Sequence, residues 1–438
     1  MFWFRRDLRL HDNRGLAFAT SGDLPVLPLF IFDTGILSKL EDRDDARVGF
    51  IHSTLLEMRE ALKASGSDLL VLHGKPVEVW KKVLKDYDVQ EVVINHDYEP
   101  YARDRDRAVY DLLSKSGVAM KSSKDHVVFE KAEVSKDDGK PYTVFTPYFR
   151  KWLATLTSDD LKPSKVVSNF LEWTAPTFPS LSDLGFEANA ISIPGASVTP
   201  KLIKNYEETR NLPAITGTSR LGVHLRFGTV SIRELVRKAK AAAKDDIWLK
   251  ELVWREFFTQ ILWHFPHVVK GPFRPEYASV AWRHDEKEFM AWTEGRTGYP
   301  IVDAGMRELN ATGFMHNRVR MITASFLVKH LAIDWKWGEA YFARRLLDFE
   351  LASNNGNWQW VAGTGCDAAP YFRVFNPQLQ QKKFDAEGEY VKRWVPEIET
   401  PHYPKPIVDH VVARTRIMKL YSTGLGRKAP APSKSVRS

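Results

Sequence analysis

The chain opens with the stretch MFWFRRDLRLHDN (residues 1–13), in which an apolar segment, Met1–Phe4, runs directly into a group of arginines. Further strand-like apolar segments follow at Leu24–Phe32, Asp68–His73, Val89–Asn95 and around Val127–Phe129. Amphipathic stretches separate them at Asp44–Ala64, Val77–Asp86 and Tyr101–Ser116. This alternation is typical of βαβ units, so the N-terminal part is predicted to be an α/β domain with a Rossmann-like parallel sheet.

The arginines after the first strand allow two interpretations. Arg5, Arg6 and Arg9 either line a crevice at the carboxyl ends of the strands or are ordinary surface residues. Their charges also stand where a secretion signal needs an apolar core, so we expect no export signal. No apolar run reaches the roughly 18 residues that span a bilayer, so we expect no membrane partner.

Cysteine content limits the chemistry. The only cysteine is Cys366, which excludes an intramolecular disulfide framework and a cysteine-rich metal site. A reducing, cytoplasmic setting is expected. His264 and His267, in the segment HFPH, are interpreted as packing or surface residues because no carboxylate or thiol completes a ligand set. We therefore predict no metal site.

Residues 160–200 contain five prolines and no clean periodicity, which indicates a linker. We place an α/β domain at residues 1–130, an interdomain linker at 131–200, a larger all-α domain at 201–422 and a disordered basic tail at 423–438. The helices expected in the all-α domain are Ser231–Ala243, Trp248–Phe265, Asp285–Glu294, Ile301–Thr312, Arg318–Leu331, Lys336–Leu347 and Asp409–Tyr421.

Charge and tryptophan are unevenly distributed. Residues 1–200 hold 26 basic and 30 acidic side chains, whereas residues 201–438 hold 37 and 25. A basic second half suggests a polyanion partner, although a solvated basic surface explains it equally well. Ten of the 14 tryptophans lie between Trp248 and Trp394, where they could stack on bases or on a flavin, or form core.

Four short motifs could carry chemistry, and three of them have a plainer alternative. Thr218–Gly222 could hold a pyrophosphate at a helix start, or be a simple N-cap. Glu251 and Trp254 share a helix face, as amphipathic packing also requires. Asn317 and Met321 likewise share a face and could contact a base, with Arg318 pointing elsewhere, toward a phosphate. The stretch 351–360 places amides beside tryptophans, or is a helix break at Gly356 with aromatic packing.

One apparent motif is rejected. Gly363–Ala368 matches the glycine pattern of dinucleotide-binding folds. It falls in a region of helical patterns, without the strand and the βαβ unit that such a fingerprint requires.

The chain resembles the photolyase/cryptochrome family nearly from end to end, and within it the class I enzymes that split cyclobutane pyrimidine dimers. The resemblance is carried by nine ordered blocks: FWFRRDLRLHDN, VFTPYFRKW, TSRLG, ELVWREFF, GRTGYPIVDAGMREL, TGFMHNRVRMITASFLVK, NNGNWQW, GCDAAPYFRVFNPQLQQKKFD and GEYVKRWVPE.

The resemblance implies an FAD, reduced and anionic in the active state, which passes an electron to a flipped-out lesion under light. Implied flavin contacts are Tyr206, Thr218, Ser219, Arg220, Leu221, Gly222, Trp248, Arg255, Asn317, Arg320, Asp348, Glu350 and Asn354. The implied lesion pocket is Glu251, Trp254, Asn317, Met321 and Trp360. Implied contacts to phosphates of damaged DNA are Arg210, Arg318 and Arg373.

The resemblance also implies a tryptophan chain that relays electrons to oxidised flavin, formed by Trp358, Trp335 and Trp282. Asn354 would face flavin N5, where a neutral amide tolerates the anionic flavin and favours repair over plant-type signalling. Glu251, Asn317 and Met321 favour cyclobutane dimers, since relatives that repair (6-4) photoproducts carry glutamine and histidines there. Departures from the family pattern are Phe314, Glu350 and Asn357.

Some properties stay open on the sequence alone. The segment Asp97–Arg103 lacks the Asn-Glu pair of folate-binding relatives, so an antenna chromophore (deazaflavin, flavin or folate) or none is compatible with it. We expect a monomer. A photosensor that does not repair DNA, and a basic nucleic-acid-binding module without catalysis, are the alternatives from other functional classes.

Overall fold

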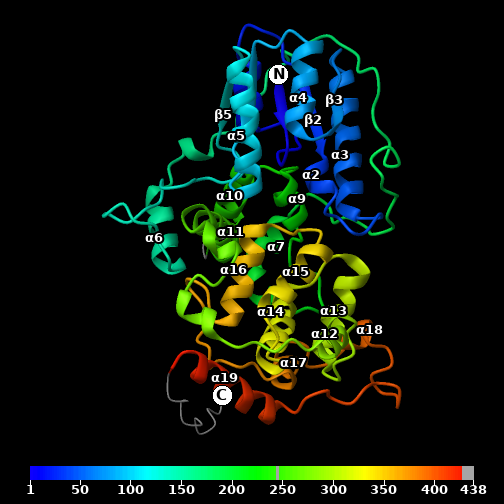
Figure 1. The fold of residues 1–438 in the computed structure, drawn as a ribbon, viewed down its shortest axis with the longest axis vertical. Coiled ribbons are helices and arrows are strands. Elements are labelled where there is room, and N and C mark those ends of the chain that lie inside the picture. The colour runs from blue at the N-terminus through cyan, green and yellow to red at the C-terminus, as the bar shows by residue number, and fades with distance from the viewer. Residues whose placement is uncertain (243–245, 427–438) are drawn as a thin grey trace. The chain divides into compact units, whose positions relative to one another are not determined.

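The computed structural model describes residues 1–242 and 246–426, which divide into two compact units (Figure 1). The first unit comprises Met1–Pro141, Tyr148–Ile203 and Ser219–Trp263, and the second comprises Tyr142–Pro147, Lys204–Thr218 and the chain from His264 onward. These units cut the chain differently from the predicted domain boundaries, which stay a prediction. The expected helix end at Ala243 and residues 427–438 of the expected tail lie outside the described residues.

The first unit contains one parallel sheet of five strands. The strands are β1 (Phe2–Phe4), β2 (Pro28–Asp33), β3 (Leu70–Gly74), β4 (Glu91–Asn95) and β5 (Ala119–Ser123), in the order β3-β2-β1-β4-β5. Phe2 of the central strand pairs with Pro28 on one side and Val93 on the other. Every residue of β1 and β2 is buried, as expected for parallel strands covered on both faces. The predicted α/β fold class is thereby confirmed.

Helices connect the strands in the expected alternation. They are α1 (Arg14–Thr20), α2 (Thr34–Leu37), α3 (Ala46–Lys63), α4 (Pro76–Asp86) and α5 (Pro100–Lys115). The helices α4 and α5 pack against each other, and proline stands at the first position of both, where it costs no hydrogen bond (Figure 1). Trp80 of α4 meets Trp3 of β1 edge-to-face at 5.7 Å, which anchors this helix layer on the sheet.

The expected strand at Val127–Phe129 is wrong. The fifth strand is β5, which is polar and mostly exposed at the sheet edge, so its sequence carries little strand signal. Val127, Val128 and Phe129 are buried, but the backbone N–H groups of Val128 and Phe129 donate to the carboxylate of Glu256, at 2.7 and 3.1 Å. A buried carboxylate therefore takes the place of a ladder partner for this apolar run.

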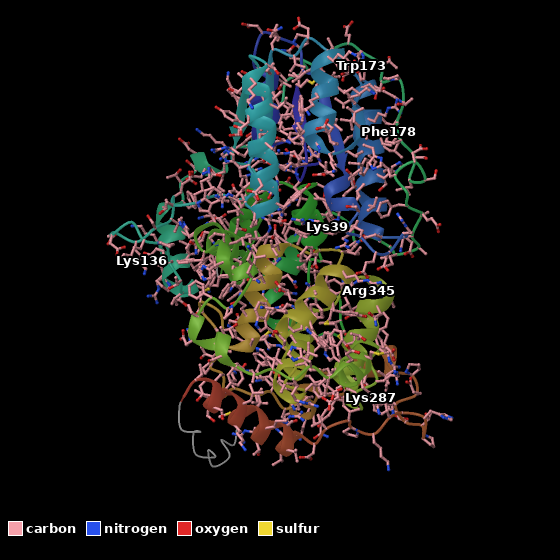
Figure 2. The ribbon with its side chains drawn as sticks, in the orientation of Figure 1. Lys39, Lys136, Trp173, Phe178, Lys287 and Arg345 are labelled. Atoms are coloured by element: carbon pink, nitrogen blue, oxygen red, sulfur yellow. The ribbon has the colours of Figure 1, made fainter. Side chains whose placement is uncertain are left out.

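The segment expected to be a linker contains structure and is fastened to the sheet. It includes α6 (Phe145–Thr155) and the short 3₁₀ helix η1 (Asp159–Leu161). Phe170 forms a parallel bridge with Val26. Trp173 meets Tyr87 edge-to-face at 6.2 Å, and Phe178 lies 5.4 Å from the guanidinium of Arg59 (Figure 2). Residues 170–178 thus complete the covering of the α/β layer rather than span a gap.

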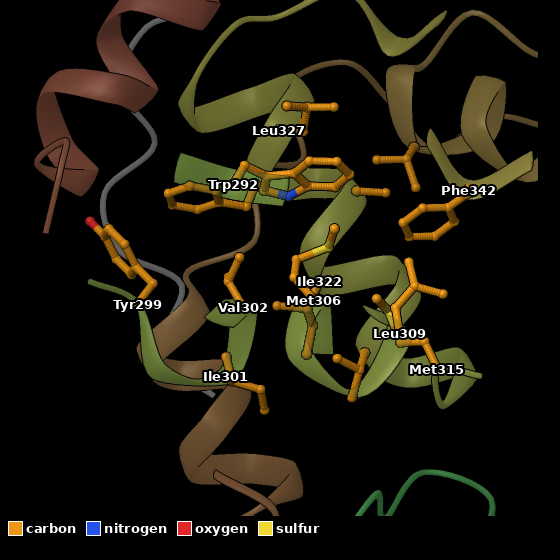
Figure 3. Close-up of a cluster of buried hydrophobic side chains, with 14 of the residues drawn as sticks. Trp292, Tyr299, Ile301, Val302, Met306, Leu309, Met315, Ile322, Leu327 and Phe342 are labelled. Atoms are coloured by element: carbon orange, nitrogen blue, oxygen red, sulfur yellow. The ribbon is translucent and has the colours of Figure 1, made fainter. Parts of the chain in front are cut away.

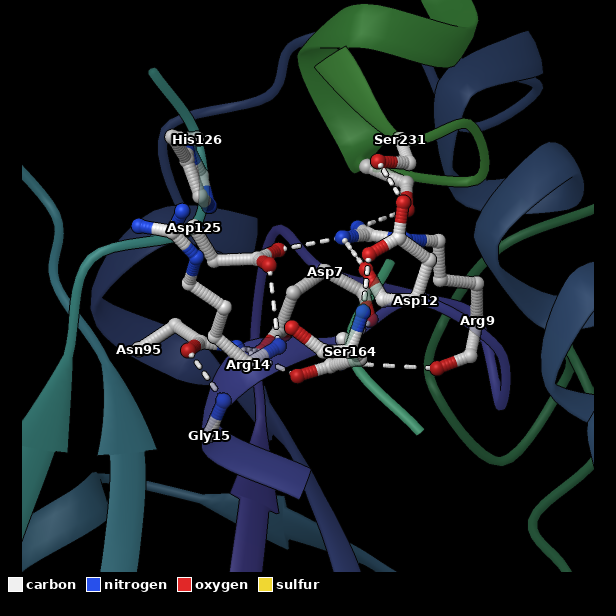
Figure 4. A network of polar contacts seen from close by, with 12 residues as sticks. Asp7, Arg9, Asp12, Arg14, Gly15, Asn95, Asp125, His126, Ser164 and Ser231 are labelled. Atoms are coloured by element: carbon white, nitrogen blue, oxygen red, sulfur yellow. Dashed lines mark hydrogen bonds and ion pairs between the residues drawn. The ribbon is translucent and has the colours of Figure 1, made fainter. Parts of the chain in front are cut away.

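Three helices from later in the chain also belong to the first unit: α9 (Gly222–Phe227), α10 (Ile232–Ala242) and most of α11 (Ile247–His264). Arg233 of α10 is fully buried and donates to Asp12 and Asp125, both at 2.9 Å. Ser231 donates to Asp12 at 2.6 Å (Figure 4). Burial raises the pKa of Asp125, but Arg9 and Arg233 outweigh it and hold the pKa at about 2. This network fastens α10 to the segment after β1.

The second unit is helical. Its core gathers Trp292, Val302 and Met306 with Ile322, Leu327 and Phe342 from successive helices (Figure 3). Its helices are α8 (Tyr206–Thr209), α12 (Glu286–Thr293), α13 (Pro300–Thr312), α14 (Asn317–Ser325), the π-helical turn η4 (Phe326–His330), α15 (Trp335–Arg345), α16 (Leu351–Ala362), α17 (Pro377–Phe384), α18 (Glu389–Trp394) and α19 (His410–Gly424), with 3₁₀ turns η2 (Pro266–Val269) and η3 (Pro275–Ser279). The short helix α7 (Pro200–Lys204) lies where the two units meet in sequence.

Three details of this unit differ from the expected pattern. The helix α16 continues through Gly356, so the alternative of a helix break there is wrong. The expected helix Arg318–Leu331 is α14 followed by η4, whose widened turn buries Lys329 and His330. The helix α19 runs three residues beyond its expected end at Tyr421. Within the described residues, no helix combines the length and apolar character needed to cross a bilayer.

Candidate functional site

The helix α11 carries the first group of predicted site residues. Trp248 is buried, while Glu251, Trp254 and Arg255 are half-buried, so Glu251 and Trp254 reach the surface of the first unit. The ring of Trp254 stacks on Phe258 at 5.4 Å and meets Phe257 edge-to-face at 5.5 Å. These two contacts fix the plane of the Trp254 ring, as a stacking wall for a base requires.

Neighbouring polar groups hold α11 in place. Arg255, an implied flavin contact, donates to the main-chain oxygens of His126 at 2.7 Å and Leu225 at 3.3 Å. Glu256 accepts from the indole N–H of Trp152 as well as from Val128 and Phe129. Burial raises the pKa of Glu256 to about 7. Sequence reasoning missed Glu256, although a carboxylate between arginine and two phenylalanines was a usable signal.

The predicted phosphate-binding segment precedes α9. This helix begins at Gly222, and its N-cap, Leu221, offers no side-chain acceptor. Among the described hydrogen bonds, none uses the hydroxyl of Thr218 or Ser219, so the simple N-cap alternative is not realised. Arg220 is exposed and adopts a left-handed conformation with φ of 51°. The first N–H groups of α9 and two hydroxyls are left for an external acceptor.

The helix α14 carries the second group. Asn317 is exposed and Met321 half-buried, so both are accessible on the second unit. Arg320 and Asp348, two implied flavin contacts, form a bidentate ion pair at 3.1 and 2.9 Å. Glu350 is buried and accepts weakly from Ser353 at 3.4 Å.

The side-chain amide of Asn354 is oriented by the chain itself. Its Nδ2 donates to the main-chain oxygen of Glu339 at 3.0 Å, and its Oδ1 has no donor among the described residues. The carboxylate of Glu339 accepts from Asn355 at 2.9 Å, and burial raises the pKa of Glu339 to about 7. Glu339 was not found from the sequence, because nothing local distinguishes it from an ordinary helical glutamate.

The three tryptophans of the implied electron chain all lie in the second unit. Trp358 and Trp335 are buried, and Trp282 is half-buried. Trp358 meets Trp292 at 6.2 Å and Phe342 at 5.0 Å, whereas Trp282 meets Tyr421 at 5.6 Å. No ring contact in the described part of the chain joins two of the three, so their order in a relay stays a prediction. Trp360 is half-buried against the core of the second unit.

Two of the predicted DNA-binding arginines act electrostatically on the third. Burial and then the positive charges of Arg210 and Arg373 lower the pKa of Arg318. Arg373 is exposed, and Arg210 lies 5.6 Å from the ring of Tyr206. Contrary to expectation, Arg318 does not point away from Met321: its Nη1 lies 3.7 Å from the Met321 sulfur. The second unit thus concentrates positive charge beside Met321.

The arginines after β1 are not surface residues. Arg6 donates to Asp97 at 3.1 Å and Glu99 at 3.0 Å, while Arg5 pairs with Asp106 at 3.1 Å. They lie at the carboxyl end of the strands, as the crevice interpretation required, with their charges paired by the segment after β4. Arg103 of this segment covers the ring of Trp263 at 4.1 Å.

The rejected motifs behave as ordinary structure. Gly363 ends α16 with φ of 77°, the left-handed conformation of a helix C-cap. His267 stacks on Phe273 at 6.2 Å. Within the described ranges 1–242 and 246–426, no group of three His, Cys, Asp or Glu side chains could hold a metal ion.

Two separate groups of donors and acceptors each suit one part of a flavin dinucleotide. The hydroxyls and N–H groups before α9 suit a pyrophosphate, and the free oxygen of Asn354 suits a ring N–H.

Comparison with known proteins agrees with this chemistry. Residues 1–167 match the family described as DNA photolyase, and residues 248–402 match the FAD binding domain of DNA photolyase. The deoxyribodipyrimidine photo-lyases of Halobacterium salinarum and Escherichia coli are 37% and 36% identical to the chain. These alignments cover 97% and 96% of the chain and 99% and 98% of the relatives.

Solved structures give the same result. A class III photolyase from Agrobacterium tumefaciens superposes with a TM-score of 0.87 at 34% identity, covering 97% of both chains. The photolyase of Sulfolobus tokodaii, solved with two FAD molecules, gives 0.85 at 35% identity, covering 96% of this chain and 99% of that one. A Synechocystis cryptochrome gives 0.84 at 25% identity, covering 96% and 98%.

Proposed function

Because the chain belongs to the photolyase/cryptochrome family and is a light-driven DNA-repair enzyme with an FAD-binding domain, we propose that its substrate is the cyclobutane pyrimidine dimer. The observation that carries this choice is the accessible pair Asn317 and Met321 on α14, with the charge of Arg318 beside the Met321 sulfur. An amide, a soft apolar side chain and a cation suit the polar edge, the saturated ring and the phosphate of a dimer.

The residues that would hold FAD divide into a phosphate-binding group and a group at the flavin ring. Thr218, Ser219 and the first N–H groups of α9 would hold the pyrophosphate, and Asn354 would face the flavin ring. The other proposed contacts are Tyr206, Arg220, Leu221, Gly222, Trp248, Arg255, Asn317, Arg320, Asp348 and Glu350. When bound and reduced, FAD supplies the electron that light drives into the lesion. The neutral side chain of Asn354 avoids a like charge beside it.

The proposed lesion contacts divide into walls and hydrogen-bonding groups. Trp254 and Trp360 would stack on the flipped bases, with Met321 as an apolar support. Glu251 and Asn317 would hydrogen-bond the lesion and stabilise the negative charge that develops on it. The stacked position of Trp254 on Phe258 supports its role as a wall, since the contact holds the plane of the ring.

Further properties are part of the same proposal. Trp282, Trp335 and Trp358 would carry electrons toward the flavin, and Arg210, Arg318 and Arg373 would contact DNA phosphates. Assignment to class I is proposed on the resemblance, a cytoplasmic location on the single cysteine, and a monomeric state completes the proposal. For a second, antenna chromophore, a deazaflavin, a flavin, a folate or none is compatible with the sequence.

Light-dependent repair of a defined lesion tests the proposal. The purified protein is chemically reduced, mixed with UV-irradiated oligothymidine, and exposed to blue light while the recovery of thymine absorbance is followed against a dark control. We expect recovery only in the light. No recovery, with FAD bound and reduced, would reject this substrate and favour a (6-4) lesion or a photosensor, which a second oligonucleotide carrying that lesion separates.

A further inference from the structure

The guanidinium of Arg318 is held by neutral groups only. Its Nε and Nη2 both donate to the side-chain oxygen of Asn211, at 3.2 and 2.6 Å, and its Nη1 donates to the Met321 sulfur. Its plane covers the ring of Phe384 at 4.3 Å. In the described part of the chain, no carboxylate lies within ion-pair distance of this arginine. Four contacts therefore orient the side chain without neutralising its charge.

This arrangement is electrostatically unfavourable until an anion arrives. Arg318 is half-buried, and the charges of Arg210 and Arg373 are close enough to lower its pKa. An arginine in such surroundings is normally paired with a carboxylate, because burial of an unpaired charge is costly. Aspartate has nearly the same shape as asparagine and would supply that pairing. The amide at position 211 keeps the geometry and leaves the positive charge available.

Two lysines near Arg318 add further positive charge. Phe384 ends α17, whose last turn carries Lys382 and Lys383, both exposed. The ammonium group of Lys383 lies 5.6 Å from the same Phe384 ring. The ring is thus the apolar support for two cations, and an anion above Arg318 would meet lysines at its edge.

We propose that Asn211 is a positioning residue that presents Arg318, with its charge uncompensated, to the phosphate diester next to the flipped lesion. The proposal rests on the proposed function and extends it to a residue outside the DNA-contact set. The placement next to the lesion follows from the 3.7 Å contact between Arg318 Nη1 and the sulfur of Met321, a proposed lesion contact. Planar, bidentate donors suit a phosphate better than a lysine would.

The test compares Asn211→Asp with Asn211→Ala and with Asn310→Asp, which adds the same charge at an exposed position of α13. Affinity for an oligonucleotide with one cyclobutane dimer is measured by fluorescence anisotropy over a series of salt concentrations, together with thermal unfolding. Because one phosphate contact accounts for a slope of about 0.9 in the plot of log Kd against log salt, Asn211→Asp should lower this slope by about 1.

For Asn211→Asp, we expect weaker DNA binding without a loss of stability. Asn211→Asp should weaken binding about tenfold, while its unfolding temperature stays equal or rises, because the aspartate pairs with Arg318 in the free protein. Asn211→Ala keeps the charge and loses only its orientation, so its salt slope should stay close to that of the unmodified protein. Asn310→Asp should change neither the affinity nor the salt slope; its unfolding temperature should fall, because aspartate cannot donate to the main-chain oxygen of Thr293 as Asn310 does at 2.8 Å.

Two results would overturn the proposal. One is binding by Asn211→Asp within twofold of the unmodified protein with an unchanged salt slope. The other is an equal loss with Asn211→Ala and Asn211→Asp at an unchanged slope, which assigns Asn211 a purely structural role. Failure of the proposed function is separate, since there the unmodified protein itself would not repair the dimer.

Discussion

Asn354 donates its side-chain amide to the main-chain oxygen of Glu339, 3.0 Å away, across the contact between α16 and α15. The bond fixes which end of the amide is turned away from α15, because a carbonyl accepts only from the nitrogen side. The oxygen of Asn354 is thereby left for a donor outside the described chain. The same glutamate binds Asn355 through its carboxylate, so one residue of α15 orients two neighbouring amides of α16.

Asn354→Asp should destabilise the anionic reduced flavin. The substitution removes the donor to Glu339 and places a negative charge where the neutral amide stood. We expect the two-electron midpoint potential of bound FAD to fall, with about 30 mV for each 1.4 kcal/mol of added repulsion. Spectroelectrochemical titration measures it. Asn357→Asp, on an exposed position of the same helix, is the control; an equal fall in both variants would contradict the placement of Asn354.

Glu251→Ala should impair repair without releasing FAD. If Glu251 stabilises the charge developing on the lesion, its loss should lower the repair rate on the order of tenfold at saturating oligonucleotide. Repair is followed by thymine absorbance and FAD content by the flavin absorbance released on denaturation. Glu60→Ala, at an exposed position of α3, should leave both unchanged. Unchanged repair in Glu251→Ala would mean that the lesion binds elsewhere.

Trp358→Phe should block light-driven reduction of oxidised FAD. Phenylalanine is too difficult to oxidise to take part in electron relay, but it preserves much of the packing against Phe342. Protein whose FAD has been reduced chemically should still repair the dimer under blue light. Trp337→Phe, a half-buried tryptophan outside the proposed relay, is the control for indole loss. If photoreduction persists in Trp358→Phe, the electron takes another route.

Lys329→Met should flatten the dependence of stability on pH. Burial lowers the pKa of Lys329 to about 7 from an ordinary value of 10.5. Between these values the unfolded chain binds a proton that the native protein lacks, so the free energy of unfolding rises with pH, by at most about 1.4 kcal/mol per pH unit. The variant should therefore gain stability most at and below about pH 7, with the gain shrinking as pH rises toward 10.5.

Urea denaturation across that pH range measures the effect on Lys329. The substitution also removes two hydrogen bonds, from Nζ to the main-chain oxygen of Tyr371 at 3.0 Å and to the Tyr421 hydroxyl at 3.2 Å. Their removal should lower stability by a similar amount at every pH. The change of the free energy of unfolding with pH therefore still reports the protonation of Lys329 alone. Lys63→Met, at an exposed position, should not alter the pH dependence. A parallel curve for Lys329→Met and the unmodified protein would show that Lys329 stays charged when buried.

Gly338→Ala should destabilise the second unit. A Cβ at this position of α15 would overlap the indole ring of Trp358 and the side chain of Leu327. Overpacking of this kind costs about 1–3 kcal/mol. Gly49→Ala on α3 meets nothing within 4 Å and should instead stabilise, by about 0.4–1 kcal/mol, through a less flexible unfolded chain. Thermal unfolding of both variants shows whether the two shifts have opposite signs.

Local patterns predicted much of the fold because the elements concerned are buried on one or both faces. The apolar run at β1 and the amphipathic pattern at α4 each reflect a fixed environment along the element itself. The edge strand β5 lacks such an environment, and its polar sequence gave no signal. Trp292 shows that a sequence signal can also mislead. It belongs to the tryptophan-rich region that suggested stacking on bases or a flavin, but it is fully buried in the core of the second unit.

The residues that sequence reasoning missed act through distant partners. Glu256 meets Val128, which precedes it by 128 residues, and Asn211 meets Arg318, which follows it by 107. Neither pairing can be recognised from hydrophobic periodicity, because a single polar residue does not indicate which distant residue it contacts. Family resemblance supplies the residues proposed to contact cofactor or substrate, but the groups that orient them became visible only through their distances.

The pairing of Asp12 with Arg233 has a consequence for how the protein is made. The two residues are separated by 221 positions, so a ribosome exposes the carboxylate long before its cation has been synthesised. A nascent chain that contains all five strands still holds a carboxylate destined for the interior without its main ion-pair partner, which costs several kcal/mol when buried. We therefore expect the sheet to reach its full stability only after α10 has been synthesised, when translation has passed the middle of the chain.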